Sequence, residues 1–192
     1  MEPVDPTDLR IGARVKARRF AAGLSLEALA ARSGVSRAAI SRIERGEASP
    51  TAQLLGRLCA GLGIDLAWLF QVEADAPAPL ARRADQPVWT DPGTGYTRRN
   101  LTPAGSTSPV RMIDVTLPPG ARVIFDLPAA DRVVDQQIYL LEGELERSLG
   151  EETWRLAPGD CLHIRLTGGS TFHNPGRVPA RYVLALALVE AG

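Results

Sequence analysis

The segment Ser25–Gly46, SLEALAARSGVSRAAISRIERG, decides the fold of the first third of the chain. Ser25 is a natural N-cap for a short helix, and Gly34 is a natural terminator of it. Ser36 is placed to cap a second helix, which Gly46 ends. Two short helices joined by a tight turn of this length form a helix-turn-helix.

Apolar periodicity extends this pattern on both sides. An apolar stripe that starts at Leu9 predicts a preceding helix ending near Gly23. Ser49 followed by Pro50 predicts the start of a fourth helix, since proline suits the first helical position. A last helical turn is expected over residues 66–70. The first 70 residues therefore predict a domain of five short helices.

Charge is concentrated in this region although the formal net charge of the chain is zero. Residues 9–60 contain ten Lys and Arg against three Asp and Glu. Arg37 occupies the first turn of the third helix, where the helix dipole disfavours a cation. Small residues beside long arginines suit a helix that enters the DNA major groove and reaches base edges. Residues 9–60 therefore predict a partner that is double-stranded DNA.

Residues 9–70 resemble the DNA-binding domain of the XRE family, the lambda/434-type repressors. The resemblance implies base contacts from Arg37, Ala38 and Arg42, and an internal pair between Arg19 and Glu44. It implies phosphate contacts near Ser25, Ser41 and Arg45. Leu26 stands where the family often has a glutamine, so no phosphate contact is expected from that side chain. With the cap of the third helix included, the candidate DNA-binding residues are Ser25, Ser36, Arg37, Ala38, Ser41, Arg42 and Arg45.

After residue 72 the pattern changes. Ala-Pro repeats over residues 73–87 predict a semi-extended linker. Short runs rich in β-branched residues follow, separated by turns such as Pro-Gly-Asp and Asn-Pro-Gly, which predicts an antiparallel sandwich or barrel. We therefore expect a helix-turn-helix domain at 1–72, the linker at 73–87, and a β domain at 88–192.

Residues 110–190 resemble the cupin family, an antiparallel β jelly-roll barrel, through the turn series around YLLEGELERSLGEETWRLAPGDCLHI and FHNPGRVPARYVLAL. In that family a His-x-His pair, a Glu and a later His are metal ligands. In this chain the Glu position is Gln136, the later His position is Ser170, and Ala129–Arg132 contain no histidine. Amide and hydroxyl groups bind transition metals poorly. The interior is therefore predicted to hold no metal and no cofactor.

One of the adjacent glutamines Gln136 and Gln137 must face the interior, because successive strand side chains point to opposite faces. We expect that side chain to be Gln136 and to hydrogen-bond an organic ligand or water. His163 and His173 are more typical of packed residues than of a displaced metal site. The candidate ligand-pocket residues are Gln136, Ile138, Ser170, Phe172, His163 and Arg98.

Other features limit the function classes. There is no run of about 18 apolar residues, and the acidic start of the chain is unlike a secretory signal, so a cytoplasmic protein is expected. Cys59 and Cys161 are predicted to be reduced, buried thiols. No catalytic nucleophile–base set is recognisable, so no catalytic residue is predicted.

Three functions remain open. The leading one is a homodimeric transcriptional regulator that binds a palindromic operator and whose cupin domain senses an unknown small molecule. The alternatives are a DNA-tethered cupin enzyme, which generally needs a metal, and a regulator whose β domain serves only as a dimerisation scaffold.

Overall fold

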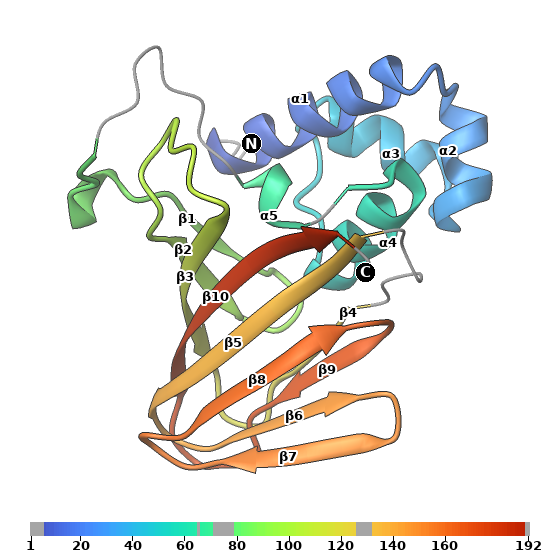
Figure 1. The fold of residues 1–192 in the computed structure, drawn as a ribbon. Helices are drawn as coiled ribbons and strands as arrows, with labels where there is room; N and C mark the ends of the chain where they lie inside the picture. The colour runs from blue at the N-terminus through green and yellow to red at the C-terminus, as the bar shows by residue number, and fades with distance from the viewer. Residues whose placement is uncertain (1–5, 65, 71–78, 126–131, 191–192) are drawn as a thin grey trace.

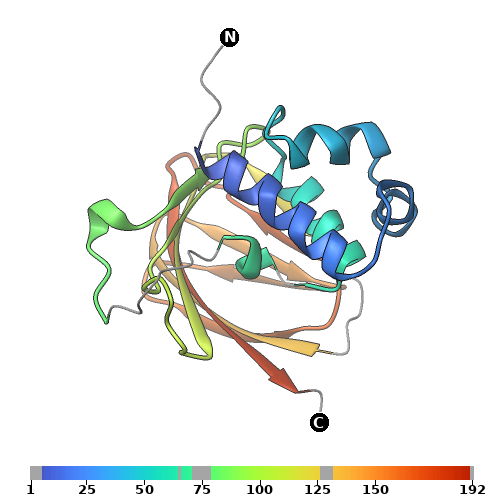
Figure 2. The ribbon, with the colours of Figure 1, turned by 90° about the horizontal axis from the view of Figure 1, so that it is seen from above.

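The computed structural model describes residues 6–64, 66–70, 79–125 and 132–190. A helical region, residues 6–70, sits at one end of a β region, residues 88–190 (Figure 1). Figure 2 shows that α1 lies across that end of the β sandwich. The bounds of the helices are α1 Pro6–Ala21, α2 Leu26–Ser33, α3 Arg37–Glu44, α4 Ala52–Leu62 and α5 Leu66–Leu69, followed by the 3-10 turn η1 Arg83–Asp85.

The caps expected for α2 and α3 are confirmed. Ser25 accepts a hydrogen bond from Ala28 N, and Gly34 ends α2 with a left-handed φ of 64°. Ser36 accepts a hydrogen bond from Ala39 N. These bonds satisfy backbone donors that the first helical turn leaves unpaired.

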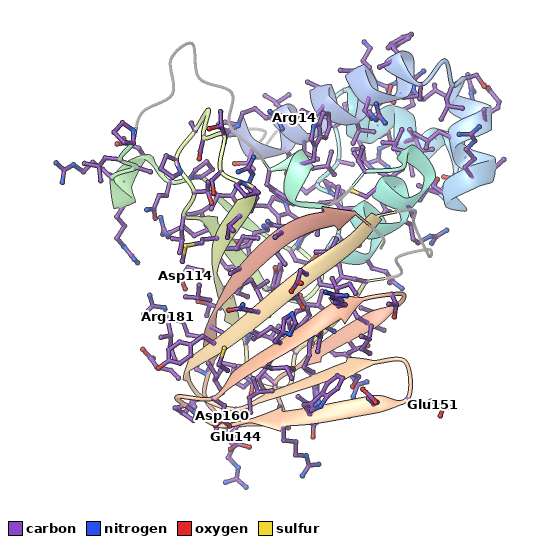
Figure 3. All side chains as sticks on the ribbon, viewed as in Figure 1. Arg14, Asp114, Glu144, Glu151, Asp160 and Arg181 are labelled. Carbon is purple, nitrogen blue, oxygen red and sulfur yellow. The ribbon has the colours of Figure 1, made fainter. Side chains whose placement is uncertain are left out.

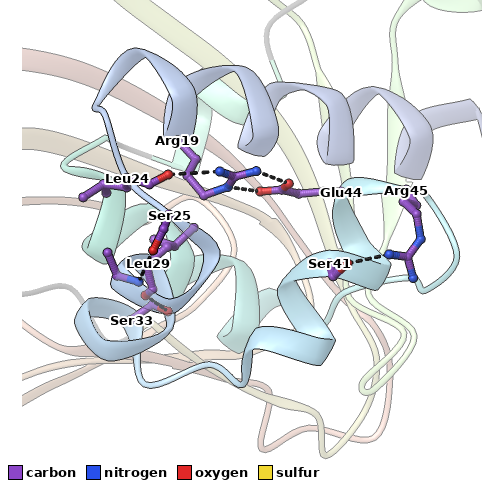
Figure 4. A network of polar contacts seen from close by, with 9 residues as sticks. Arg19, Leu24, Ser25, Leu29, Ser33, Ser41, Glu44 and Arg45 are labelled. Atoms are coloured by element: carbon purple, nitrogen blue, oxygen red, sulfur yellow. Dashed lines mark hydrogen bonds and ion pairs between the residues drawn. The ribbon is translucent and has the colours of Figure 1, made fainter.

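The buried ion pair between Arg19 and Glu44 is also confirmed (Figure 4). Arg19 Nε and Nη2 each lie 2.7 Å from a different Glu44 oxygen, and Nη1 donates to Leu24 O. The hydrogen bond to Glu44 raises the pKa of Arg19. This two-pronged contact fixes the end of α1 against α3, and so sets the orientation of α3 in the helical region.

Two helix predictions need correction. Among the described residues four helices have eight residues or more, and the fifth, Leu66–Leu69, is a single turn, so the domain has four full helices instead of the five short helices expected. The start of α4 is Ala52 with Thr51 as its N-cap, two residues after the start expected from Ser49 and Pro50. The Ser49 hydroxyl is hydrogen-bonded to Asp8 on α1, so it is engaged in a tertiary contact instead of capping the helix.

The β region consists of two antiparallel sheets that face one another. One has six strands in the order β1-β2-β3-β10-β5-β8, and the other has four in the order β4-β9-β6-β7. Within the described residues no ladder joins the two sheets, so the expected closed barrel is instead an open sandwich. The strands are β1 Val88–Thr90, β2 Thr97–Asn100, β3 Val110–Leu117, β4 Arg122–Phe125, β5 Arg132–Glu142, β6 Leu145–Leu149, β7 Glu152–Leu156, β8 Cys161–Leu166, β9 Ser170–His173 and β10 Ala180–Glu190.

Strand alternation separates an inner from an outer face of each sheet. On β5, Gln136, Ile138 and Leu140 are buried, while the residues between them are exposed. On the outer face Arg181 of β10 pairs with Asp114 of β3 at 2.9 Å, and Figure 3 shows these two side chains beside each other. The register thus directs Gln136 inward, as the sequence predicted.

The helical and β regions share one core. Phe70, at the end of the helical region, lies 5.2 Å from the Trp89 ring on β1. The amide of Ala52 on α4 donates to Asp91 Oδ1 at 3.2 Å, and the amide side chain of Asn100 on β2 donates to Phe70 O. The two regions therefore contact each other directly, with both apolar and polar groups.

Candidate functional site

The outward face of α3 is the first candidate site. Ile40 and Ile43 are buried against the other helices, whereas Arg37, Ala38 and Arg42 are exposed. The three residues expected to read bases therefore lie together on the face of α3 that the core does not use. A small side chain between two long cations leaves room for close approach to a DNA groove.

The side chains expected to contact phosphate flank this face. Ser25 and Ser36 are exposed at the starts of α2 and α3. Each hydroxyl oxygen accepts a capping bond, which leaves its hydrogen able to donate to a phosphate oxygen. Arg45 donates to the Ser41 hydroxyl (Figure 4) and pairs with Glu47 at 2.6 Å.

Arg37 has an acidic neighbour that the sequence analysis did not single out. Its Nε lies 2.6 Å from Glu27 Oε1 on α2, and both side chains are about two-thirds exposed, at 66% and 65%. Exposed ion pairs contribute little to stability, roughly 0–1 kcal/mol. Glu27 can therefore hold Arg37 in place in the free protein and yield it to DNA at small cost.

The interior of the sandwich is the second candidate site. Gln136 is 3% exposed, and its Oε1 accepts a hydrogen bond of 3.1 Å from Nη2 of Arg147 on β6. Arg147 is 0% exposed, and its Nη1 donates to Ser148 O at 2.8 Å and to Thr171 O at 3.2 Å. The buried glutamine thus faces a buried arginine that crosses from the opposite sheet.

Arg147 was missed by the sequence analysis. The signal was present, because Arg147 lies two residues after the apolar residue Leu145 on the same strand. Side chains two residues apart share a face, so Arg147 must point inward with Leu145. Its guanidinium carbon lies 4.1 Å from the centre of the Phe172 ring. Burial lowers the pKa of Arg147 to about 10, so the side chain remains a cation at neutral pH.

Three other predicted pocket residues lie in this interior: Ile138, Ser170 and Phe172 are all buried. The Phe172 ring is stacked on the Tyr182 ring, with centres 5.5 Å apart and planes 6° from parallel. Burial raises the pKa of Tyr182 well above its ordinary value. We call Gln136, Arg147, Phe172 and Tyr182 the interior polar cluster.

The remaining two pocket predictions are corrected in position. The His163 side chain is 55% exposed on the outer face of β8 and contacts Asp135, so it does not line the interior. Its register position, opposite Gln137, explains this placement. Arg98 is buried, but its guanidinium lies 4.0 Å from the Phe70 ring, where the two regions meet.

The described residues offer no group of three His, Cys, Asp or Glu placed to hold a metal ion. His173 Nδ1 lies 2.8 Å from Glu146 Oε2 on the four-stranded sheet, whereas His163 lies on the six-stranded sheet. Ala129–Asp131, which cover most of the family's His-x-His position, lie outside the described residues. Both cysteines are thiols outside any disulfide in the described residues; Cys59 is buried as expected, but Cys161 is exposed.

Comparison with known proteins supports the helix-turn-helix geometry. The Helix-turn-helix family HTH_3 matches residues 15–69. These residues form a helix-turn-helix domain. Its limits enclose α2, the turn at Gly34 and α3, together with α4 and α5.

Among solved structures, the chain is similar to an HTH_3 family transcriptional regulator from Vibrio cholerae, with a TM-score of 0.72 and 24% identity over 94% of this chain and 96% of that one. This likeness shows that the helix-turn-helix domain and the sandwich occur together in one fold. A hydroxypropylphosphonic acid epoxidase from S. wedmorenis has a TM-score of 0.47 and 16% identity, covering 94% and 97% of the two chains.

A cupin domain of an XRE family transcriptional regulator from Enterobacter cloacae has a TM-score of 0.43 and 20% identity, covering 48% of this chain and 95% of that domain. A comparison with curated proteins finds no match. Among the helices of residues 6–64 and 66–70, none is long and apolar enough to cross a lipid bilayer.

Proposed function

We propose that the protein is a sequence-specific DNA-binding transcriptional regulator whose cupin-like sandwich binds a small molecule without a metal and thereby changes operator affinity. The observation that carries the DNA-binding part is the exposed face of α3, with Arg37, Ala38 and Arg42, inside a helix-turn-helix domain. We assign residues 1–72 to DNA binding, 73–87 to the connection and 88–192 to sensing.

The regulator acts as a homodimer on a palindromic operator. One helix of eight residues covers too few base pairs for useful specificity, and paired helix-turn-helix domains bind half-sites about 10 bp apart. We place the dimer contact on the sandwich, because Leu69 and Phe70 at the end of the helical region are buried within their own chain.

Sensing is assigned to the interior polar cluster because it combines buried polar groups with aromatic walls. Purely apolar packing would be expected of a scaffold, whereas Gln136 and Arg147 are polar groups placed deep in the interior. We assign the coupling to the direct contact between Phe70 and Trp89, because it joins the end of the helical region to the first strand of the β region.

The test of DNA reading uses sites selected from random double-stranded DNA. On the selected site, Arg37→Ala should weaken binding by about 1–3 kcal/mol and relax the base preference at one position per half-site. Arg45→Ala should weaken binding to all DNA sequences alike and flatten the salt dependence of the affinity, because it removes a phosphate contact. Arg177→Ala, an exposed cation on the β9–β10 loop, is the charge-matched control and should change neither property.

Equal losses of affinity on selected and random DNA for Arg37→Ala would contradict the reading role.

Light scattering should give the mass of a dimer at micromolar concentration, and a monomer both with and without DNA would contradict the assembly. Elemental analysis of protein purified without chelator tests the metal-free interior. About one bound metal per chain would favour a DNA-tethered enzyme instead.

A further inference from the structure

The guanidinium of Arg147 is a buried charge that the described protein atoms do not balance. It is 0% exposed, and no carboxylate of the described residues lies within ion-pair distance of it. Its hydrogen bonds to the described residues all go to neutral oxygens, those of Gln136, Ser148 and Thr171. Burying an ion without a counter-charge is costly unless another group supplies that charge.

Two donors in the same cluster are also left without an acceptor. Arg147 Nε and Tyr182 Oη are buried, and neither has a hydrogen-bond partner among the described residues. Both side chains contact the Phe172 ring, the guanidinium at 4.1 Å and the tyrosine ring at 5.5 Å. A cation and a neutral hydroxyl donor are thus gathered around one aromatic ring.

This combination matches a carboxylate in both charge and hydrogen bonding. A carboxylate only accepts hydrogen bonds, and arginine binds it with a charge-assisted bond that is stronger than one between neutral groups. The tyrosine hydroxyl can donate to the second oxygen. A metal cation would be repelled by Arg147, and a neutral ligand would leave its charge unbalanced.

The surroundings favour an anion with an apolar remainder. The Phe172 and Tyr182 rings and the side chain of Ile138 line the same interior and present hydrocarbon surface. A single guanidinium balances one negative charge. The chemistry therefore fits a small monocarboxylate, with its charged end at Arg147 and its hydrocarbon part among the rings.

We infer that the interior polar cluster binds a small organic monocarboxylate, held by Arg147 and Tyr182, with Gln136 orienting the guanidinium. This inference rests on the proposed sensing function and names the chemical class of its ligand. Gln136 is the orienting group because its Oε1 accepts from Nη2, which leaves Nε as the donor for the ligand.

The test compares acetate, propionate, butyrate and benzoate with their primary amides, at constant ionic strength, by thermal shift and calorimetry on the full-length protein. At least one carboxylate should bind wild type at least tenfold more tightly than its amide. Arg147→Met should abolish that difference, and Arg147→Lys, which keeps the charge, should recover part of it. Arg155→Met, whose side chain is 85% exposed on β7, is the matched control and should behave as wild type.

Tyr182→Phe gives a second test that does not remove the buried charge. It keeps the ring stack on Phe172 and should weaken carboxylate binding several-fold while leaving amide binding unchanged. This variant remains informative if Arg147→Met does not fold. Carboxylates that bind no better than amides, or binding that is indifferent to both substitutions, would overturn the inference and leave Arg147 as a structural link between β6 and β5.

Operator titrations separate this inference from the proposed function. A neutral compound that stabilises the sandwich and changes operator affinity would support sensing and overturn the anionic class. A carboxylate that binds through Arg147 and leaves operator affinity unchanged would support the anion site and overturn sensing. The scaffold function would then be the better account of the sandwich.

Discussion

Arg147 is a buried cation in the interior of the sandwich. Strand alternation turns Gln136 of β5 and Arg147 of β6 toward that interior, where both are buried. The hydrogen bond between them, however, joins residues of two different sheets. Alternation gives the face of a side chain, but it does not give the partner across the interior.

We expect the pH dependence of stability to reveal this buried charge in the ligand-free protein. Burial lowers the pKa of Arg147 from its ordinary value to about 10, so between these two values the unfolded chain binds more protons than the folded chain. The folded state carries the full penalty below pH 10, about 3 kcal/mol, and is relieved of it as the pH rises. In urea titrations, the free energy of unfolding of wild type should rise relative to that of Arg147→Met by about 1 kcal/mol per pH unit above pH 10.

Titrations of groups far from Arg147 should cancel in this comparison, since both proteins share them. An arginine with a hidden carboxylate partner would have a raised pKa. The difference between wild type and Arg147→Met would then stay constant from about pH 8 to about pH 11.

At the scale of elements, β3 to β10 fall in the part of the chain where short runs alternate with glycine- or proline-containing turns, the pattern from which an antiparallel sandwich or barrel was predicted. β1 and β2 were not predicted. They have three and four residues, and β2 reads TRRN, which carries no apolar alternation. Their strand conformation depends on pairing with each other and with β3, which no local pattern encodes.

The start of α4 shows the same dependence on distant residues. Thr51 accepts a hydrogen bond from Leu54 N at 3.3 Å, and Asp91 of the β region accepts one from Ala52 N at 3.2 Å. Asp91 is 2% exposed and also accepts from Gly93 N and Thr94 Oγ1. The first turn of α4 is therefore capped by groups from both regions of the chain.

We predict that Asp91→Ala destabilises the protein by about 2 kcal/mol or more, because it removes a charged acceptor shared by three buried or half-buried donors. Thr51→Ala, which removes only the local cap, should cost about 1 kcal/mol. Hydrogen exchange should show loss of protection at the Ala52 amide in Asp91→Ala. Unchanged protection there would mean that Asp91 does not hold α4.

At the scale of the whole molecule, the helical region and the β region share one core. The division into two domains joined by a semi-extended linker stays a prediction. The linker prediction came from the Ala-Pro composition of residues 73–87, which describes the connection and not the surfaces on either side of it. Phe70 and Trp89 are separated by that connection but contact each other. Composition cannot predict such a contact, because it depends on how both surfaces are folded.

The shared core contains a continuous series of aromatic contacts between the helix-turn-helix domain and the interior polar cluster. Successive ring centres are 5.2–6.4 Å apart along Phe70, Trp89, Tyr96, Phe125, Phe172 and Tyr182. Packed cores have discrete arrangements and deform little between them. A ligand that reorients Phe172 or Tyr182 would therefore shift the packing at Phe70. It changes DNA binding if it binds the two DNA-binding states with different affinity.

Trp89→Leu tests this route, because it removes the ring between Phe70 and Tyr96 while keeping an apolar side chain in the core. In wild type, a coupling of about 1–3 kcal/mol would change operator affinity about five- to 150-fold on effector binding. We expect Trp89→Leu to retain effector binding and effector-free operator binding, but to reduce that change toward onefold. Trp154→Leu, a half-buried residue on β7 outside the series, is the matched control and should keep the full response. Operator titrations of both variants with and without effector measure the coupling, and a wild-type response in Trp89→Leu would show that the signal takes another path, such as the polar contact between Asp91 and α4.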